Sequence, residues 1–138
     1  MIKIMNADVA SNSYREFKKW ITDKWGVVEE LATEDNDYGN PLPLLAFDDL
    51  VVGGLSFATN KDDDGNDMLW INSLFVVDTY RHLGIGTKLV LEAEKKAIAH
   101  GVKELFAYTE IPELYKKLSW VVLEVNGENS VVMKRLNK

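Results

Sequence analysis

The sequence predicts an α/β fold of the α+β type, in which about four helices flank a mixed, mostly antiparallel twisted sheet of six to seven strands. The first reason is the order of its segments, β-α-(α)-β-β-β-α-β-α-β-β, because consecutive strands usually pair as hairpins. The second is the stretch from Met68 to Thr109, where an apolar run, a long amphipathic run and another apolar run follow one another. That order predicts one central β-α-β crossover.

The composition is that of an ordinary globular chain. Its 138 residues fit one domain, 1–138, and it has no cysteine, so it has neither a disulfide framework nor a thiolate metal site. The net charge of −6 argues against nucleic-acid binding and slightly favours a cationic small substrate. We find no signal segment and no apolar run of about 18 residues, and therefore expect a cytoplasmic protein that does not contact membranes.

The first part of the chain predicts a strand at residues 1–5 and a helix over 11–25. The helix has apolar residues at helical spacing, which are Tyr14, Phe17, Ile21 and Trp25. Ser13 and Glu16 have the spacing of a capping box at its start. A weaker helix is expected at 27–34 before the turn residues that follow.

The middle of the chain predicts two strands, 42–49 and 50–60, joined at Asp48 and Asp49. Residues 61–67, "KDDDGND", form a polar turn. An EF-hand calcium loop is the alternative, but its twelfth position is Ile71 instead of glutamate and no helix flanks it. The apolar run after this turn predicts a strand that is buried on both faces.

The second half predicts a helix over 84–100, ended by Gly101, with the inner stripe Leu89, Val90, Ala93 and Ala97. On its outer face Glu92 and Lys96 have the spacing of an ion pair. A strand over 102–109 and a short helix over 112–118, opened by proline, come next. Two strands, 120–125 and 130–136, then flank "NGEN", which is a hairpin signal.

The stretch "YRHLGIGT", residues 80–87, lies between a predicted strand and a predicted helix. It does not fit a Walker loop, because Lys88 follows Thr87 and the glycine spacing differs. Nor does it fit a dinucleotide fingerprint, because position 89 is leucine. It matches R-x-x-G-x-G through Arg81, Gly84 and Gly86, and its backbone N–H groups at a helix start could bind a pyrophosphate.

With Val76 before this loop and Tyr115 and Trp120 after it, the second half of the chain resembles the GNAT superfamily of acyl-CoA-dependent N-acyltransferases. The resemblance implies acetyl-CoA as acyl donor, bound at the strand and the loop. The residues implied are Leu74, Phe75, Val76, Arg81, His82, Leu83, Gly84, Ile85, Gly86 and Thr87. Two departures are Ser119 in place of the family's usual glycine and the missing asparagine near Thr109 and Glu110.

The family position of Tyr115 implies a general acid that protonates the departing thiolate. The alternative is a core aromatic, since aromatic residues at helical spacing usually serve packing. The family's glutamate base is absent, so Asn72, Glu110 and Asp67 are the candidates to act through a water molecule. We expect no metal.

The acceptor is expected to be a primary amine of a small molecule or a peptide, attacking directly in a ternary complex. Trp20, Trp25 and Tyr38 could line its pocket, and Asp35 and Asp37 would suit a cation, although core packing and a solvated loop explain these residues equally well. The sequence leaves a homodimer open. A non-catalytic acyl-CoA-binding sensor or interaction module with the same fold is the alternative function.

Overall fold

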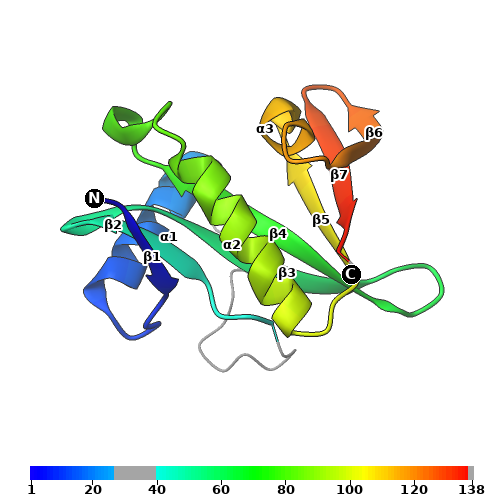
Figure 1. Cartoon of the computed structure of the whole chain (residues 1–138), viewed down its shortest axis with the longest axis horizontal. Helices are drawn as coiled ribbons and strands as arrows, with labels where there is room; N and C mark the ends of the chain where they lie inside the picture. Colours follow the sequence, from blue (N-terminus) through cyan, green and yellow to red (C-terminus); the bar gives the residue numbers. More distant parts are fainter. Residues whose placement is uncertain (27–39, 137–138) are drawn as a thin grey trace.

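The computed structural model describes residues 1–26 and 40–136. In this part of the chain one mixed sheet holds seven strands in the order β1-β2-β3-β4-β5-β7-β6 (Figure 1). The strands are β1 Lys3–Asn6, β2 Leu44–Asp48, β3 Leu50–Lys61, β4 Asp67–Val76, β5 Glu104–Thr109, β6 Val121–Asn126 and β7 Asn129–Arg135. Only the β4–β5 pair is parallel. The predicted fold class and its single crossover are confirmed.

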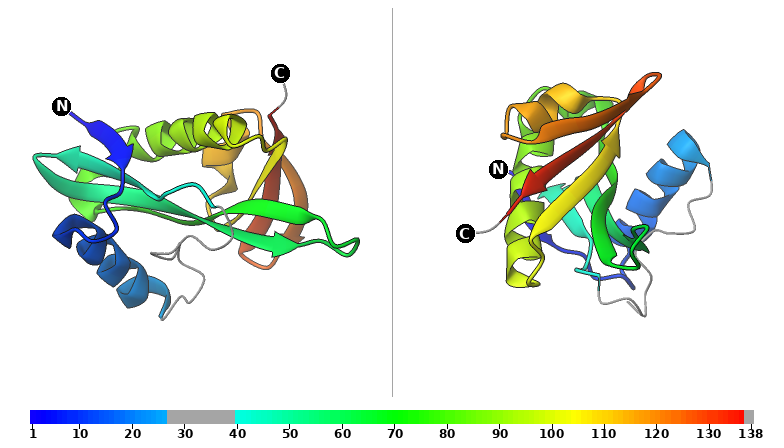
Figure 2. Two further views of the ribbon diagram at one scale, coloured as in Figure 1. Left: turned by 90° about the horizontal axis from the view of Figure 1, so that it is seen from below. Right: turned by 90° about the vertical axis from the view of Figure 1, so that its right-hand side faces the viewer.

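Three α-helices lie on the two faces of the sheet: α1 Asn12–Trp25, α2 Ile85–Ala99 and α3 Pro112–Lys116. Helix α1 covers one face, while α2 and α3 lie on the other (Figure 2). Each face has its own apolar cluster, a larger one under α2 and a smaller one under α1. None of the helices in the described residues is long and apolar enough to cross a membrane. The helix predicted at 27–34 lies outside the described residues.

Helix α1 begins two residues earlier than the predicted capping box would place it. Ser11 is the N-cap, and its Oγ accepts a hydrogen bond from the N–H of Tyr14 at 3.1 Å. Ser13 is therefore inside the helix, and the capping-box prediction was wrong. Tyr14, Phe17 and Ile21 are buried as predicted, but Trp25 is 46% exposed because the helix ends there, beyond the sheet surface that covers the others.

Helix α2 has the predicted inner stripe, since Leu89, Val90, Ala93 and Ala97 are all fully buried. Its end is a Schellman motif, in which Gly101, at φ +83°, donates to Ile98 O and Val102 donates to Ala97 O. The predicted outer pair differs: Glu92 contacts Lys95 at 3.8 Å, and Lys96 instead donates to Asn6 Oδ1 of β1. The Lys96 ammonium group therefore contacts the sheet instead of Glu92.

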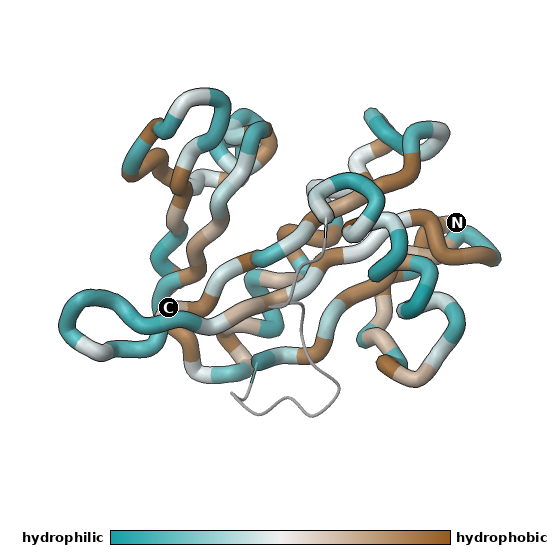
Figure 3. Tube along the Cα trace, turned by 180° about the vertical axis from the view of Figure 1, so that it is seen from behind, coloured by the Kyte–Doolittle hydropathy of each residue, from teal (hydrophilic) through white to brown (hydrophobic). Residues whose placement is uncertain are grey.

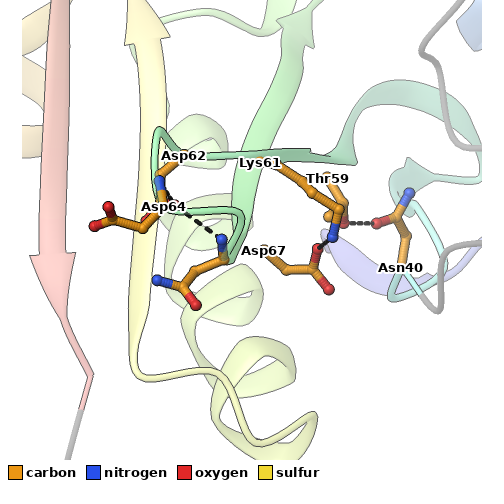
Figure 4. Close-up of polar contacts among 7 residues, drawn as sticks. Asn40, Thr59, Lys61, Asp62, Asp64 and Asp67 are labelled. Atoms are coloured by element: carbon orange, nitrogen blue, oxygen red, sulfur yellow. Dashed lines mark hydrogen bonds and ion pairs between the residues drawn. The ribbon is translucent and has the colours of Figure 1, made fainter.

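The turn at residues 61–67 is a polar hairpin between β3 and β4, as predicted, with Lys61 opposite Asp67. Asp62 accepts from the N–H groups of Asp64 at 2.9 Å and Asn66 at 2.8 Å (Figure 4). Strands flank this turn on both sides, which excludes the helix-flanked EF-hand. In residues 1–26 and 40–136, no group of three or more His, Cys, Asp or Glu side chains could hold a metal ion.

Candidate functional site

The site begins where β4 and β5 separate. The two strands pair in parallel only from Leu69 to Ile71 on β4, opposite Leu105 to Ala107 on β5. Antiparallel pairing of β4 with β3 continues to Val76. Beyond Ile71 the two parallel strands diverge (Figure 1). In the second half of β4, the backbone groups that face β5 therefore form no pair with β5. These groups can pair with an extended ligand.

A β-bulge marks the point of separation. Ser73 lies opposite Ser56 of β3 and Ile71 lies opposite Phe57, so Asn72 is the additional residue on β4. Its Nδ2 atom is buried without a hydrogen-bond partner. Since buried polar groups are nearly always paired, an orphaned amide at this point is a candidate for contact with a bound molecule or water. The prediction that β4 is buried on both faces was wrong: Leu69 and Ile71 are buried, while their neighbours are half-buried, so one face of the strand is better covered than the other.

The segment after β4 is tied to the sheet. The N–H of Val77 donates to Val52 O at 2.9 Å, and a short 3-10 helix, Asp78–Tyr80, follows. The Tyr80 hydroxyl donates to Asp48 Oδ2 at 2.7 Å, which raises the pKa of the phenol and lowers that of the carboxyl group. Arg81 donates from Nε to Val76 O at 2.8 Å. These contacts hold the loop at the end of β4.

The predicted anion loop ends at the N-terminus of α2. Gly84 is the N-cap residue, with φ 83° and ψ 9°, a left-handed conformation that favours glycine. The N–H groups of Ile85, Gly86 and Thr87 form the first turn, where the helix itself supplies no acceptor. This turn has no acidic residue, although the chain has 22. The N-terminus of α2 is therefore open to an external anion.

The other predicted loop residues have different environments. Ile85 is buried in the core below the helix, so only its backbone faces outwards. His82 has φ 67° and is exposed, as are Leu83 and Lys88. The Arg81 guanidinium group is already paired with Asp78 at 2.7 Å. The positive charge that remains beside the loop therefore comes from Lys88 and the helix dipole.

The two glycines of the loop are needed for different reasons. A β-carbon on Gly84 would meet no atom within 4 Å, so its conformation is what requires glycine. A β-carbon on Gly86 would lie 3.2 Å from Leu114 Cδ1, so its missing side chain is what allows α3 to approach α2. Because Leu114 precedes Tyr115, this close contact brings the tyrosine to the loop end of α2.

Tyr115 is 2% exposed and belongs to the core cluster under α2. Its ring meets that of Trp120 edge to face, with the ring centroids 4.9 Å apart. Burial raises the pKa of the Tyr115 phenol well above its usual value, because an ionised oxygen would lose its hydration there. The phenol is therefore protonated at neutral pH, and Tyr115 packs in the core.

The candidates for a base lie in three different places. Asn72 is at the bulge, whereas Glu110 follows β5 and pairs with Lys24 of α1 at 3.5 Å. Lys24 Nζ is 5.9 Å from the centroid of the Phe75 ring, so this ion pair lies near β4 on the α1 face. Asp67 is at the opposite end of β4, bound to Lys61 at 2.6 Å. At about 3.3 Å per residue it lies far from the bulge, so the structure does not bring Asp67 together with Asn72.

The two tryptophans suggested for an acceptor pocket have different environments. Trp20 packs against Phe75, with ring centroids 5.7 Å apart. Trp25 contacts Lys24, whose Nζ is 4.9 Å from the centroid of its ring. The other suggested residues, Asp35, Asp37 and Tyr38, lie outside the described residues.

Comparison with known proteins decides the family. The model of the Acetyltransferase (GNAT) family matches residues 7–120, which is most of the chain. The chain belongs to the GNAT acetyltransferase family. Its residues 7–120 include β4, the loop, α2 and Tyr115, the parts of the chain in which the sequence resembles GNAT proteins.

Solved structures share the GNAT fold at low sequence identity. The NatC complex, solved with Gag peptide and CoA, has a chain with TM-score 0.75 and 19% identity, and the match covers 99% of both chains. The PaiA N-acetyltransferase of Thermoplasma acidophilum, solved with coenzyme A, has TM-score 0.66, 19% identity and coverage of 98% and 99%. NAA60 of Arabidopsis thaliana with acetyl-CoA has TM-score 0.70, 15% identity and the same coverage. A search of curated proteins finds no match.

Two charged residues of this GNAT fold were missed by the sequence reasoning. Glu94 of α2 is buried, and its carboxylate contacts Lys134 of β7 at 3.0 Å. A signal was present in both cases. Position 94 has helical spacing from the buried residues Val90 and Ala97, and Lys134 is two residues from both Val132 and Leu136, which puts it on the same, buried face. A charge at an inward position of each element should have suggested a buried pair.

Proposed function

We propose that this GNAT protein transfers an acetyl group from acetyl-CoA to a primary amine of a small molecule or a peptide, by direct attack in a ternary complex. The observation that carries the proposal is the open half of β4, which leads directly to an acid-free helix N-terminus. A thioester with an extended arm and a pyrophosphate fits these two features in sequence. The NatC structure with Gag peptide and CoA supports a peptide among the acceptors to be tested.

In the proposed complex, the N–H groups of residues 84–87 bind the pyrophosphate. The side chains of Arg81, His82 and Leu83 flank it, while the backbone of residues 74–76 pairs with the pantetheine arm. Backbone N–H groups of this part of β4 stabilise the carbonyl oxygen as it gains negative charge, an effect commonly worth a few kcal/mol.

The reaction forms a carbon–nitrogen bond and breaks the carbon–sulfur bond of the thioester, and two proton transfers accompany it. The nitrogen lone pair of the neutral amine attacks the thioester carbon, and the carbon–sulfur bond then breaks. The sulfur leaves as a thiolate, which takes the proton from the phenol of Tyr115. The proton released by the attacking nitrogen passes to a water molecule held by Asn72 or Glu110. Tyr115 is reprotonated from solvent before the next turnover.

The test is thiol release from acetyl-CoA with a panel of small amines and peptides, using wild type and Tyr115→Phe. We expect thiol release with at least one acceptor, and a loss of kcat of about 10²-fold in Tyr115→Phe because the general acid is missing. Tyr14→Phe is the matched control, since it also removes one hydroxyl group from a buried tyrosine, but on α1, in the other apolar cluster.

Two results would contradict the proposal. Acetyl-CoA could raise the melting temperature while no acceptor releases thiol, which is the behaviour of the non-catalytic acyl-CoA-binding module. Alternatively, Tyr115→Phe could keep the full kcat across the pH range, which would remove the general-acid role alone.

A further inference from the structure

A buried carboxylate connects α2, β7 and the segment between α3 and β6, behind the proposed catalytic tyrosine. Glu94, in the middle of α2, is 8% exposed, and both of its oxygens are engaged. Oε2 accepts from the indole Nε1 of Trp120 at 2.9 Å, and Oε1 accepts from Lys134 Nζ at 3.0 Å. Lys134 Nζ also donates to Leu118 O at 2.8 Å. We call these three side chains the Glu94 network.

The Glu94 network holds Trp120, which contacts Tyr115 both through its ring and through its backbone. The Trp120 ring meets the Tyr115 ring edge to face. In addition, the backbone N–H of Trp120 donates to the backbone carbonyl oxygen of Tyr115 at 3.1 Å. Between them the chain turns at Ser119, which has φ 75°. The position of the indole ring therefore limits where the phenol ring can lie.

The contacts of this network bear on orientation as well as on stability. A buried ion pair is often no more stabilising than apolar side chains of the same volume. A carboxylate that is held at both oxygens cannot rotate, however, and it therefore holds the indole N–H in one direction. Groups that transfer protons need such support, because a displacement of about 1 Å can cost about 10²-fold in rate.

We infer that Glu94 is a positioning residue, which acts through Trp120 to orient the phenol of Tyr115 toward the departing sulfur. This inference rests on the proposed role of Tyr115. Lys134 supports this arrangement, because it donates to the second oxygen of Glu94 and to the carbonyl group of Leu118, just after α3.

A double-mutant cycle on kcat tests the inference. Glu94→Leu removes the acceptor of the indole N–H, and Glu94→Gln keeps an oxygen acceptor at nearly the same place. Both are measured in wild type and in the Tyr115→Phe background. Glu92→Gln, a half-exposed position on the same helix, is the matched control. If Glu94→Leu fails to fold, Trp120→Phe is the second variant. It removes the indole N–H that donates to Glu94 and keeps an aromatic ring in the core.

We expect Glu94→Leu or Trp120→Phe to lower kcat about tenfold with an unchanged KM for acetyl-CoA, since a misplaced acid affects only the chemical step. Glu94→Gln should recover most of the loss. In the Tyr115→Phe background the same changes should lower kcat less than about twofold, because no acid remains to be positioned.

Equal factors in both backgrounds, or a loss that appears in KM, would overturn the inference and leave the proposed function standing. An unchanged kcat in Tyr115→Phe alone would instead overturn the general-acid role, and the inference would fall with it. The single variant and the cycle therefore distinguish the two failures.

Discussion

Strand β4 has a glycine-bearing loop at each end, and the two loops differ in whether an acidic side chain accepts from their backbone N–H groups. In the hairpin before β4, the Asp62 carboxylate accepts from two N–H groups, and the Gly65 N–H donates to Asp62 O at 3.0 Å. In the loop after β4, the first turn of α2 has no acidic residue to accept from it. Figure 3 shows the hairpin as a hydrophilic projection away from the rest of the molecule.

This difference teaches what a glycine pattern alone does not reveal. Gly65 has φ 85° and Gly84 has φ 83°, so the two residues serve the same backbone conformation. In the hairpin, the carboxylate and the carbonyl oxygen of Asp62 accept from the N–H groups of Asp64, Asn66 and Gly65. The first turn of α2 has no carboxylate that competes for its N–H groups, which makes this loop the better candidate for a phosphate site.

The largest effect is expected when the loop at α2 receives a carboxylate of its own. Thr87→Glu places a negative charge in the first turn of α2, where it competes with the pyrophosphate and repels it. We expect the Kd for acetyl-CoA to rise about 30-fold. The thermal stability should rise slightly, by about 0.3–1 kcal/mol, because the charge complements the helix dipole.

Calorimetric titration and thermal unfolding measure these two opposite changes on the same samples. Thr87→Gln is the matched control, with nearly the same shape and no charge. If the glutamate and glutamine variants bind acetyl-CoA equally well, the charge of an anion has no part in binding at this turn.

A smaller effect is expected at the hairpin. Hydrogen bonds from the N–H groups of Asn66 and Asp64 hold the pKa of the Asp62 carboxyl group below its usual value. A lowered pKa means that the folded state favours the charged form, so this contribution to stability is present above the unfolded pKa of about 3.9. It is lost as the pH falls through the lower, folded value.

Asp62→Asn should therefore lower the melting temperature slightly at pH 7, and the difference from wild type should shrink below about pH 4. The KM for acetyl-CoA should not change. Asp63→Asn in the same turn is the control. A change in KM for Asp62→Asn alone would contradict the separation of the two loops.

The local patterns of the sequence predicted much of the fold, because they depend on neighbouring residues. The inner stripe of α2, the glycine at its end and the β3–β4 and β6–β7 hairpins follow from spacing and turn chemistry. The N-cap at Ser11 was missed because Ser13 and Glu16 offered a competing local pattern. Lys96 was misassigned because its partner, Asn6, is 90 residues away in the chain.

The candidate site was predicted less completely, since much of it is tertiary. The separation of β4 from β5 and the bulge at Asn72 depend on strand register, which no local spacing determines. The contact of Gly86 with Leu114 depends on how two helices pack. The buried pair of Glu94 and Lys134 could have been suspected from each residue's position, but not its connection to Trp120.

The central claim is that the loop after β4, and not the one before it, binds the anion of the acyl donor. The most direct test is the affinity for CoA, measured by calorimetry, of Gly84→Val and Gly65→Val. At both positions a β-carbon would meet no atom within 4 Å and the backbone is left-handed, so the strain is matched, at about 1–3 kcal/mol. We predict similar losses of melting temperature and a loss of affinity of about tenfold or more only in Gly84→Val. Equal affinity in the two variants would contradict the claim.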